Sequence, residues 1–186
     1  MKRFFDLVIG FFMIMVFMIP IGLICFAIKL TSNDSIFYWS DRVGKNGMIF
    51  RMPKFRTMKS STPVMATHLL FDLGQYLTPL GSFLRKTSLD ELPQLVSVLV
   101  GKMSFVGPRP ALFNQDDLIG LRIQHGIDKL VPGLTGWAQV NGRDELSIPD
   151  KVQYDLEYLH NQSFLFDMRI LILTLFKVIL RSGVSH

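Results

Sequence analysis

An unbroken apolar run at residues 7–28 constrains this chain more than any other feature of its sequence. The run contains no charged side chain, and a helix needs about 20 predominantly apolar residues to cross a bilayer. The sequence therefore predicts a membrane helix. A cleavable signal peptide would have a shorter apolar core followed by a small-residue cleavage site, which Lys29-Leu30-Thr31 does not supply.

Pro20 lies inside this run, where it removes a backbone donor and predicts a kink. Two geometries are open to a kinked apolar helix. A tilted span is favoured by the tolerance of membrane helices for proline. A re-entrant helix, which enters and leaves by one face, is favoured by Lys2-Arg3 and Lys29, because the positive-inside preference places both charged ends in the cytoplasm.

The remaining length suits one compact domain, so we expect a membrane helix at 1–30 and a single domain at 31–186. A hydrophobic share of 49% combined with a formal charge of +5 is typical of a protein at a membrane surface. The basic residues form no stripe, which argues against a nucleic-acid partner. Cys25 is the only cysteine, so a disulfide framework and a thiolate metal site are excluded.

Residues 35–56 predict a β-hairpin, because the strand-like runs 36–39 and 48–51 flank Gly44-Lys45-Asn46-Gly47. Residues 60–80 are rich in Ser, Thr, Pro and Gly and predict a mobile connection with one short helix.

Elsewhere the chain reads as helices joined by loops. The Gly/Pro-punctuated segments 104–110 and 131–143 are expected to be loops. The last helix is interrupted by charges and is expected to lie in the core or at the membrane interface. Helices are expected at 88–100, 150–160 and 164–181. The predicted fold class is mostly α with a small β-hairpin (α+β).

Asp90 and Glu91 are the best candidates for chemistry. If a helix begins at about Asp90, Pro93 falls in its first turn, where its missing donor costs nothing. The two carboxylates would then share the positive end of that helix with any bound phosphate. A helix cap is the competing interpretation, because Ser88 and Glu91 have the spacing of a capping box.

Cationic residues accompany the carboxylate pair. An arginine in a rigid Pro/Gly loop is preset for bidentate contact with phosphate oxygens, and several such cations indicate a diphosphate pocket. Mg²⁺ would suit this pocket, with Asp90 and Glu91 as its protein ligands, because it takes few carboxylates together with phosphate oxygens and waters. The four histidines share no motif and receive no role. The candidate phosphate-binding cations are Lys54, Arg56, Arg85, Arg109 and Arg143.

Several segments, in one order over nearly the whole chain, resemble the bacterial sugar transferases, the small monotopic (PglC-like) phosphoglycosyl transferases. They are Lys2-Arg3-Phe4-Phe5-Asp6, Lys54-Phe55-Arg56-Thr57-Met58, Ser88-Leu89-Asp90-Glu91-Leu92-Pro93-Gln94-Leu95, Met103-Ser104-Phe105-Val106-Gly107-Pro108-Arg109-Pro110 and Pro132-Gly133-Leu134-Thr135-Gly136-Trp137-Ala138-Gln139-Val140-Asn141-Gly142-Arg143.

This resemblance implies a re-entrant helix bent at Pro20, and interfacial amphipathic helices around a compact domain on the cytosolic face of the bacterial inner membrane. It implies that a UDP-sugar donates sugar-1-phosphate to polyprenyl (undecaprenyl) phosphate and releases UMP, with downstream glycosyltransferases as further partners. Asp90 would be the nucleophile, and Glu91 would hold Mg²⁺ or manage protons. The residues expected to contact phosphate or substrate are Lys54, Arg56, Arg85, Arg109, Gln139 and Arg143.

The sequence departs from the family pattern at Pro53, Lys102 and Val131, and the last removes an expected positive charge near residues 129–143. Two other functions remain open. A Mg²⁺-dependent hydrolase would use the same carboxylate pair with water as acceptor. A membrane-anchored scaffold would use the pair only as a cap. The identity of the sugar is left open.

Overall fold

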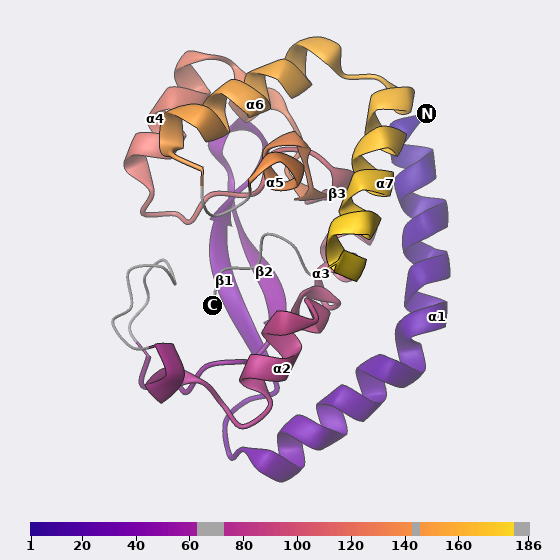
Figure 1. Ribbon diagram of the computed structural model, residues 1–186, viewed down its shortest axis with the longest axis vertical. Coiled ribbons are helices and arrows are strands. Elements are labelled where there is room, and N and C mark those ends of the chain that lie inside the picture. Colours follow the sequence, from indigo (N-terminus) through magenta and orange to yellow (C-terminus); the bar gives the residue numbers. More distant parts are fainter. Residues whose placement is uncertain (63–72, 143–145, 181–186) are drawn as a thin grey trace.

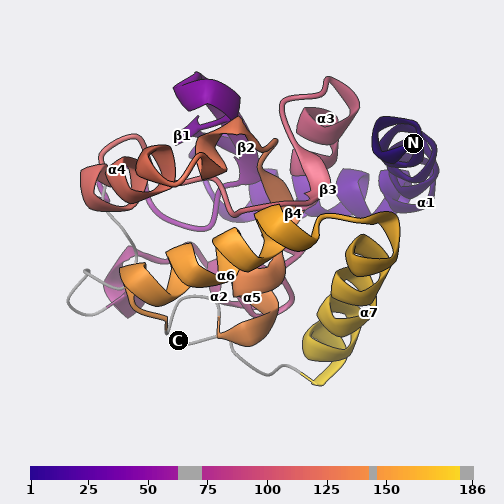
Figure 2. The same cartoon turned by 90° about the horizontal axis from the view of Figure 1, so that it is seen from above.

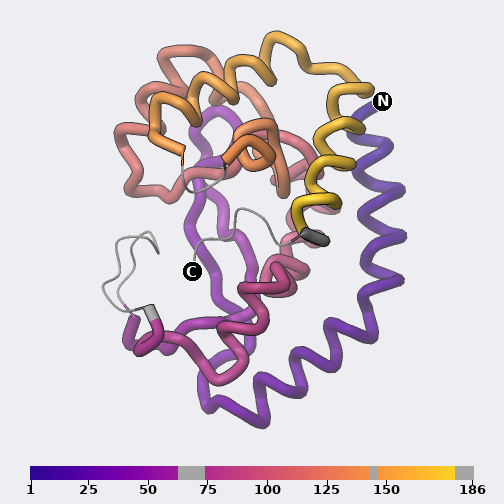
Figure 3. The backbone as a smooth tube through the Cα atoms, viewed as in Figure 1, coloured from indigo at the N-terminus to yellow at the C-terminus, as the bar shows by residue number. Residues whose placement is uncertain are grey.

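The computed structural model describes residues 1–62, 73–142 and 146–180. Helix α1 (Lys2–Thr31) is continuous and contains Pro20. Figures 1 and 3 show that α1 changes direction about midway along its length. A bend of this kind follows from the backbone donor that proline removes from the helix.

Most apolar side chains of α1 point away from the rest of the protein. Only 6% of its most apolar 18-residue stretch is buried, and Phe11, Phe12 and Ile19 are each more than half exposed. A core helix of a soluble protein would hide such side chains, since large apolar surfaces are costly in water. Helix α1 therefore has the length, composition and exposure of a membrane helix.

The predicted hairpin is confirmed. Strands β1 (Phe37–Val43) and β2 (Ile49–Phe55) pair antiparallel, with Phe37 opposite Phe55 and Val43 opposite Ile49. A short 3-10 turn, Lys45–Gly47, joins them. Asn46 and Gly47 both have positive φ there, at 56° and 73°. This conformation explains why an Asn-Gly pair marks the turn.

The predicted helix over 88–100 is divided. A single 3-10 turn, Leu89–Glu91, is followed by the short helix α3 (Gln94–Leu99). Ser88 has a φ of 56°, in the left-handed region, so a helix cannot run through it. Pro93 is the N-cap of α3 and not part of the first turn of a helix that begins at Asp90.

The expectation of loops at 104–110 and 131–143 is wrong in part. Strand β3 (Ser104–Val106) pairs in parallel with β4 (Gly133–Thr135), and α5 (Trp137–Asn141) follows directly. These elements are too short to leave a periodic pattern in the sequence.

The predicted C-terminal helices are confirmed as α6 (Ile148–Asn161) and α7 (Phe164–Leu180). Helix α7 buries Ile170 and Asp167 and exposes apolar side chains such as Phe176, as expected of a helix between a core and an interface. Figures 1 and 2 place α7 beside the N-terminal half of α1, where Phe5 and Phe164 meet edge to face.

The remaining elements are short. Helix α2 (Gly81–Lys86) lies near the open end of the hairpin, whereas α4 (Asp116–Gln124) and α6 lie near its turn (Figure 1). Of the predicted connection 60–80, residues 63–72 lie outside the described part, and Leu73–Tyr76 forms one 3-10 turn.

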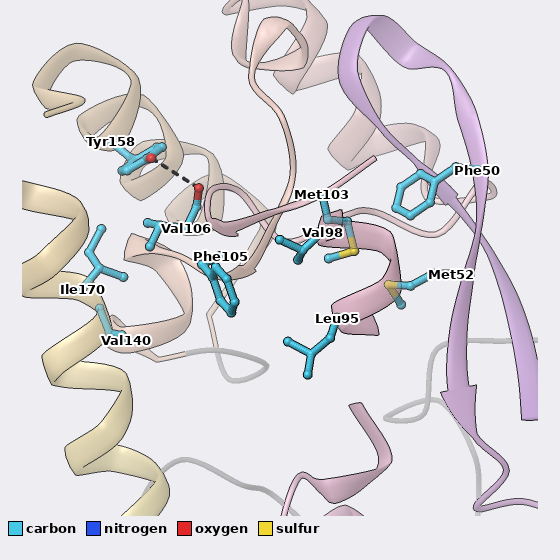
Figure 4. Close-up of a cluster of buried hydrophobic side chains, with 10 residues drawn as sticks. All are labelled: Phe50, Met52, Leu95, Val98, Met103, Phe105, Val106, Val140, Tyr158 and Ile170. Carbon is cyan, nitrogen blue, oxygen red and sulfur yellow. Dashed lines mark hydrogen bonds between the residues drawn. The ribbon is translucent and has the colours of Figure 1, made fainter. Parts of the chain in front are cut away.

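The largest core cluster joins the hairpin, α3, β3 and the C-terminal helices (Figure 4). Phe50 and Met52 of β2 face Leu95 and Val98 of α3 across this core. Partly buried side chains from the first half of α1 pack against the same cluster, and side chains from its second half pack on a separate cluster around Phe55. Both halves of α1 thus pack on the same domain.

Candidate active site

Asp90 and Glu91 occupy the 3-10 turn that precedes α3, and the interpretation of this pair as a capping box is wrong. The Ser88 side chain makes no capping hydrogen bond, and Ser88 lies in the left-handed region with a φ of 56°. The backbone alone closes the turn, through the Glu91 N–H and the Ser88 carbonyl at 3.2 Å. The two carboxylates are therefore not needed to cap the start of a helix.

Glu91 is held between two cations that come from distant parts of the chain. Its Oε1 accepts a hydrogen bond from Lys54 Nζ at 2.8 Å and another from Arg109 Nη2 at 3.1 Å. All three side chains are largely buried, which strengthens the attraction between their charges. Strand β2 supplies Lys54, and the loop after β3 supplies Arg109.

Asp90 is more buried than Glu91 and is bonded differently. It is 9% exposed, and no hydrogen bond reaches its carboxylate from any residue that the structure describes. Burial raises its pKa above the ordinary range; the Lys54 charge opposes this rise, whereas the Glu91 charge adds to it. Arg85 and Arg109 also act to lower the Asp90 pKa. Asp90 is thus a carboxylate surrounded by cations with its oxygens open to a ligand.

Lys54 titrates as part of the same cluster. Burial lowers the pKa of its amine, and the charge of Glu91 acts in the opposite direction. Burial raises the pKa of Asp90 and lowers that of Lys54 for the same reason, which is the cost of holding a charge away from water. Opposite charges in the cluster thus counteract the effect of burial on the pKa values of Lys54 and Asp90.

The structure gathers some of the sequence-predicted residues and not others. Arg85 of α2 lies 3.5 Å from the Met58 sulfur and within electrostatic range of Asp90. Arg56 instead donates to the Ser35 carbonyl and hydroxyl and lies over the Tyr38 ring.

Gln139 of α5 donates to the Leu134 carbonyl at 3.3 Å, and its buried Oε1 has no partner within the described ranges. Arg143 lies outside the described residues. The carboxylate pair, Lys54, Arg85 and Arg109 therefore form one cluster, whereas the hydrogen bonds of Arg56 and Gln139 go to other residues.

Backbone contacts fix the loop that carries Arg109. A Cβ added to Gly107, Gly133 or Gly136 would come within 2.4 Å of a backbone atom, so the two glycine-containing segments touch main chain to main chain. The Gly133 N–H donates to the Pro108 carbonyl, one residue before Arg109. The glycines of both motifs thus serve close packing beside the site.

Arg122 and Asp155 support the site and were not predicted. Arg122 donates through Nη1 to the Arg109 carbonyl at 2.8 Å, and through Nη2 to Asp155 Oδ2 at 2.6 Å. A sequence signal for both exists. Each charge lies one helical turn after a buried apolar residue, Arg122 after Leu118 in α4 and Asp155 after Val152 in α6.

A resident cage of protein ligands for a metal is absent from the described residues, where no group of three or more His, Cys, Asp or Glu is found. Two neighbouring carboxylates are a donor set that fits Mg²⁺ shared with phosphate oxygens and water. The surrounding cations point to the same ligand, since together they favour a highly charged anion such as a diphosphate.

Comparison of this sequence with known proteins finds bacterial proteins of one family. The family model described as bacterial sugar transferase matches residues 1–181. The sugar transferase EpsL of Bacillus subtilis is 37% identical over 100% of this chain and 91% of its own length. The exopolysaccharide production protein ExoY of Sinorhizobium fredii is 34% identical over 98% of this chain and 87% of its own length.

A third relative is the UDP-glucose:undecaprenyl-phosphate glucose-1-phosphate transferase of Escherichia coli. It is 36% identical over 95% of this chain, which spans 40% of that protein. Because the family match and two of these relatives extend over nearly the full length of both chains, this protein belongs to the bacterial sugar transferase family.

Proposed function

We propose that this protein transfers a sugar-1-phosphate from a UDP-sugar to polyprenyl phosphate and releases UMP, through a covalent intermediate on Asp90. The names of its relatives support the substrate classes, since proteins of Escherichia coli and Xanthomonas campestris at 36% and 39% identity are UDP-glucose:undecaprenyl-phosphate glucose-1-phosphate transferases. The catalytic part would be 31–186, with α1 as its membrane element.

The observation that carries the proposal is the unequal bonding of the two carboxylates. Glu91 is occupied by Lys54 and Arg109, whereas Asp90 accepts no hydrogen bond from the described residues. A nucleophile needs a lone pair that is free to reach the electrophile. Of the two carboxylates, Asp90 has that freedom, and Glu91 fixes the cations beside it.

The reaction would proceed in two displacements. An Asp90 carboxylate oxygen would bond to the sugar-side phosphorus while that phosphorus loses its bond to the bridging oxygen, which leaves with its electron pair as part of UMP. A phosphate oxygen of polyprenyl phosphate would then attack the same phosphorus. The Asp90 oxygen would leave with the bonding pair, which restores the carboxylate and yields a polyprenyl diphosphate sugar.

The cations would act mainly on the phosphate oxygens. Lys54, Arg85 and Arg109 surround the carboxylates in a partly buried site, where fixed positive charge stabilises the charge that develops in the transition state. When bound, Mg²⁺ would add charge neutralisation at the diphosphate, with Asp90 and Glu91 as its protein ligands.

The proposal is tested with purified protein, a panel of labelled UDP-sugars and polyprenyl phosphate. The expected result is label in the lipid with one sugar, and UMP release together with label on Asp90 when lipid is omitted. Free sugar-1-phosphate at a rate independent of lipid would indicate a hydrolase. Absence of turnover with every sugar would favour a scaffold. If the lipid became labelled in the complete reaction but no UMP were released when lipid was omitted, polyprenyl phosphate would attack the UDP-sugar directly.

Removal of divalent metal should stop the reaction. We expect EDTA to abolish UMP release, and added Mg²⁺ to restore it, because arginine and lysine alone leave part of the diphosphate charge uncompensated. Initial rates are measured across a titration of free Mg²⁺, with circular dichroism to confirm that EDTA leaves the fold intact. Full activity in excess EDTA would contradict the metal assignment and leave the nucleophile untouched.

We further propose that α1 is re-entrant and that the domain faces the cytoplasm. Two contacts support this topology. At its start, Lys2 bonds to Tyr158 and Asp167, and near its end, Ile28 is buried against the domain. A straight span would hold these two ends about 40 Å apart on opposite sides of the membrane, where a domain on one side could not contact both.

Cysteine labelling tests this topology. In a Cys25→Ser background, single cysteines placed before Met1 and at Lys45 should both resist an impermeant maleimide in intact cells and react after lysis. Labelling of the N-terminal cysteine alone from outside would contradict a re-entrant helix.

Pro20→Leu should straighten α1 toward a span and lower UMP release by misplacing the domain.

A further inference from the structure

The chain between Asp90 and Arg109 forms a folded-back unit. Helix α3 leads away from the carboxylate pair, the chain reverses at Gly101, where φ is 81°, and β3 leads back towards Arg109. The two open ends of this unit meet where Arg109 Nη2 bonds to Glu91 Oε1 at 3.1 Å. The spacing between catalytic carboxylates and Arg109 therefore depends on how the reversed end is held.

The first turn of α1 holds that reversed end. Arg3 donates from Nη1 to the Val98 carbonyl at 2.5 Å and from Nη2 to the Leu99 carbonyl at 2.6 Å. Carbonyls at a helix C-terminus lack partners within the helix, so Arg3 completes the hydrogen bonding at the end of α3. Gly10, two turns along α1, allows a close approach to the Leu99 side chain.

Asp6 holds β3, the second half of the folded-back unit. Its Oδ1 accepts hydrogen bonds from the Phe105 backbone N–H and the Ser104 hydroxyl, both at 3.1 Å. One edge of β3 is paired with β4, and the Asp6 carboxylate satisfies a backbone donor that β4 does not reach. Asp6 is 4% exposed, and burial of a polar group is costly unless it is hydrogen-bonded in this way. A membrane anchor alone would not need such a carboxylate.

We propose that Asp6 and Arg3 are positioning residues, through which the first turn of the membrane helix sets the distance between the carboxylate pair and Arg109. The proposal rests on the transferase function proposed above. Its consequence is specific. Release of UMP from a water-soluble UDP-sugar requires the docked membrane helix, even when no lipid substrate is present.

Asp6 offers the cleaner test, because acidic residues contribute little to membrane topology whereas Arg3 contributes to it. Asp6→Ala removes both hydrogen bonds, and Asp6→Asn keeps an acceptor oxygen at nearly the same volume. We expect Asp6→Ala to lower kcat for UMP release by about 100-fold, the scale of a small misplacement of catalytic groups. Asp6→Asn should remain within about fivefold of wild type, since only the charge is lost.

A double-mutant cycle separates positioning from general destabilisation. If Asp6 acts through Arg109, then Asp6→Ala should cost less than about threefold once Arg109→Ala is present. Ser104→Ala, which removes one of the two bonds and leaves α1 intact, should show a smaller loss with the same non-additivity, and it serves if Asp6→Ala does not fold. Multiplicative losses, or an Asp6→Asn variant as impaired as Asp6→Ala, would overturn the proposal.

Hydrogen exchange provides a readout that is independent of activity. Asp6→Ala should accelerate amide exchange across residues 104–109 and in the last turn of α3, and Asp6→Asn should not. If the wild-type protein released no UMP from any UDP-sugar, the transferase proposal would fail while this exchange difference still supported the positioning role. Unchanged exchange in Asp6→Ala would overturn the positioning role even in an active enzyme.

Discussion

Asp90→Asn should reduce UMP release at least about 10³-fold, the scale of loss when an enzyme's nucleophile is removed. Asparagine preserves the volume of the side chain but lacks the anionic oxygen that would bond to phosphorus. Asp90 makes no hydrogen bond to the described residues, so the substitution breaks none among them and removes only a charge near Lys54, Arg85 and Arg109. Thermal unfolding in detergent should therefore change little, and the measured loss would report on chemistry.

Glu91→Gln is the matched control, because it also removes one carboxylate charge at nearly constant volume. Lys54 and Arg109 would both lose their ionic partner, so we expect severe slowing with residual UMP release and a measurable loss of stability. The label from a UDP-sugar should still reach Asp90. If Asp90→Asn still released UMP and Glu91→Gln did not, the roles of the two carboxylates would have to be exchanged.

The long elements of this fold could be predicted from the sequence because their patterns are local. Helix α1 is marked by an uncharged apolar run with a proline inside it, and the hairpin is marked by Asn46-Gly47 between apolar strands. In both cases the residues that determine the structure lie next to each other in the chain. Hydrophobic periodicity and turn chemistry are then sufficient.

The elements around the site could not be predicted in this way. Strands β3 and β4 have three residues each, and Gly107, Gly133 and Gly136 allow their backbones to meet. In the sequence these glycines are typical of loops, because close packing between distant segments leaves no periodic signal. Ser88 is a similar case, since a left-handed serine cannot be recognised from its neighbours.

The sequence indicated which of the candidate residues lie together better than it indicated their contacts. Asp90, Glu91, Lys54 and Arg109 do form one cluster. Arg56 follows the end of β2 and bonds to Ser35 instead. The sequence could not show that Glu91 joins two cations while Asp90 is left open, because that difference arises from three segments meeting in space.

The largest stability effect should come from Asp155→Ala. This substitution would leave Arg122, a residue that is only 9% exposed, without its carboxylate partner, and an unpaired buried charge costs about 3–5 kcal/mol. Chemical denaturation in detergent, followed by tryptophan fluorescence, measures the change in unfolding free energy. Asp117→Ala, an exposed aspartate in the first turn of α4, should cost less than about 1 kcal/mol.

Replacing both partners distinguishes stability from function at this pair. An Arg122→Met/Asp155→Leu variant should recover much of the lost stability, since apolar side chains of similar volume can replace a buried ion pair. It should not recover UMP release, because Arg122 also donates to the Arg109 carbonyl at 2.8 Å and methionine cannot. A double variant with full stability and full activity would show that Arg109 is held without Arg122. Full stability with reduced activity would instead assign Arg122 to the support of the phosphate-binding loop.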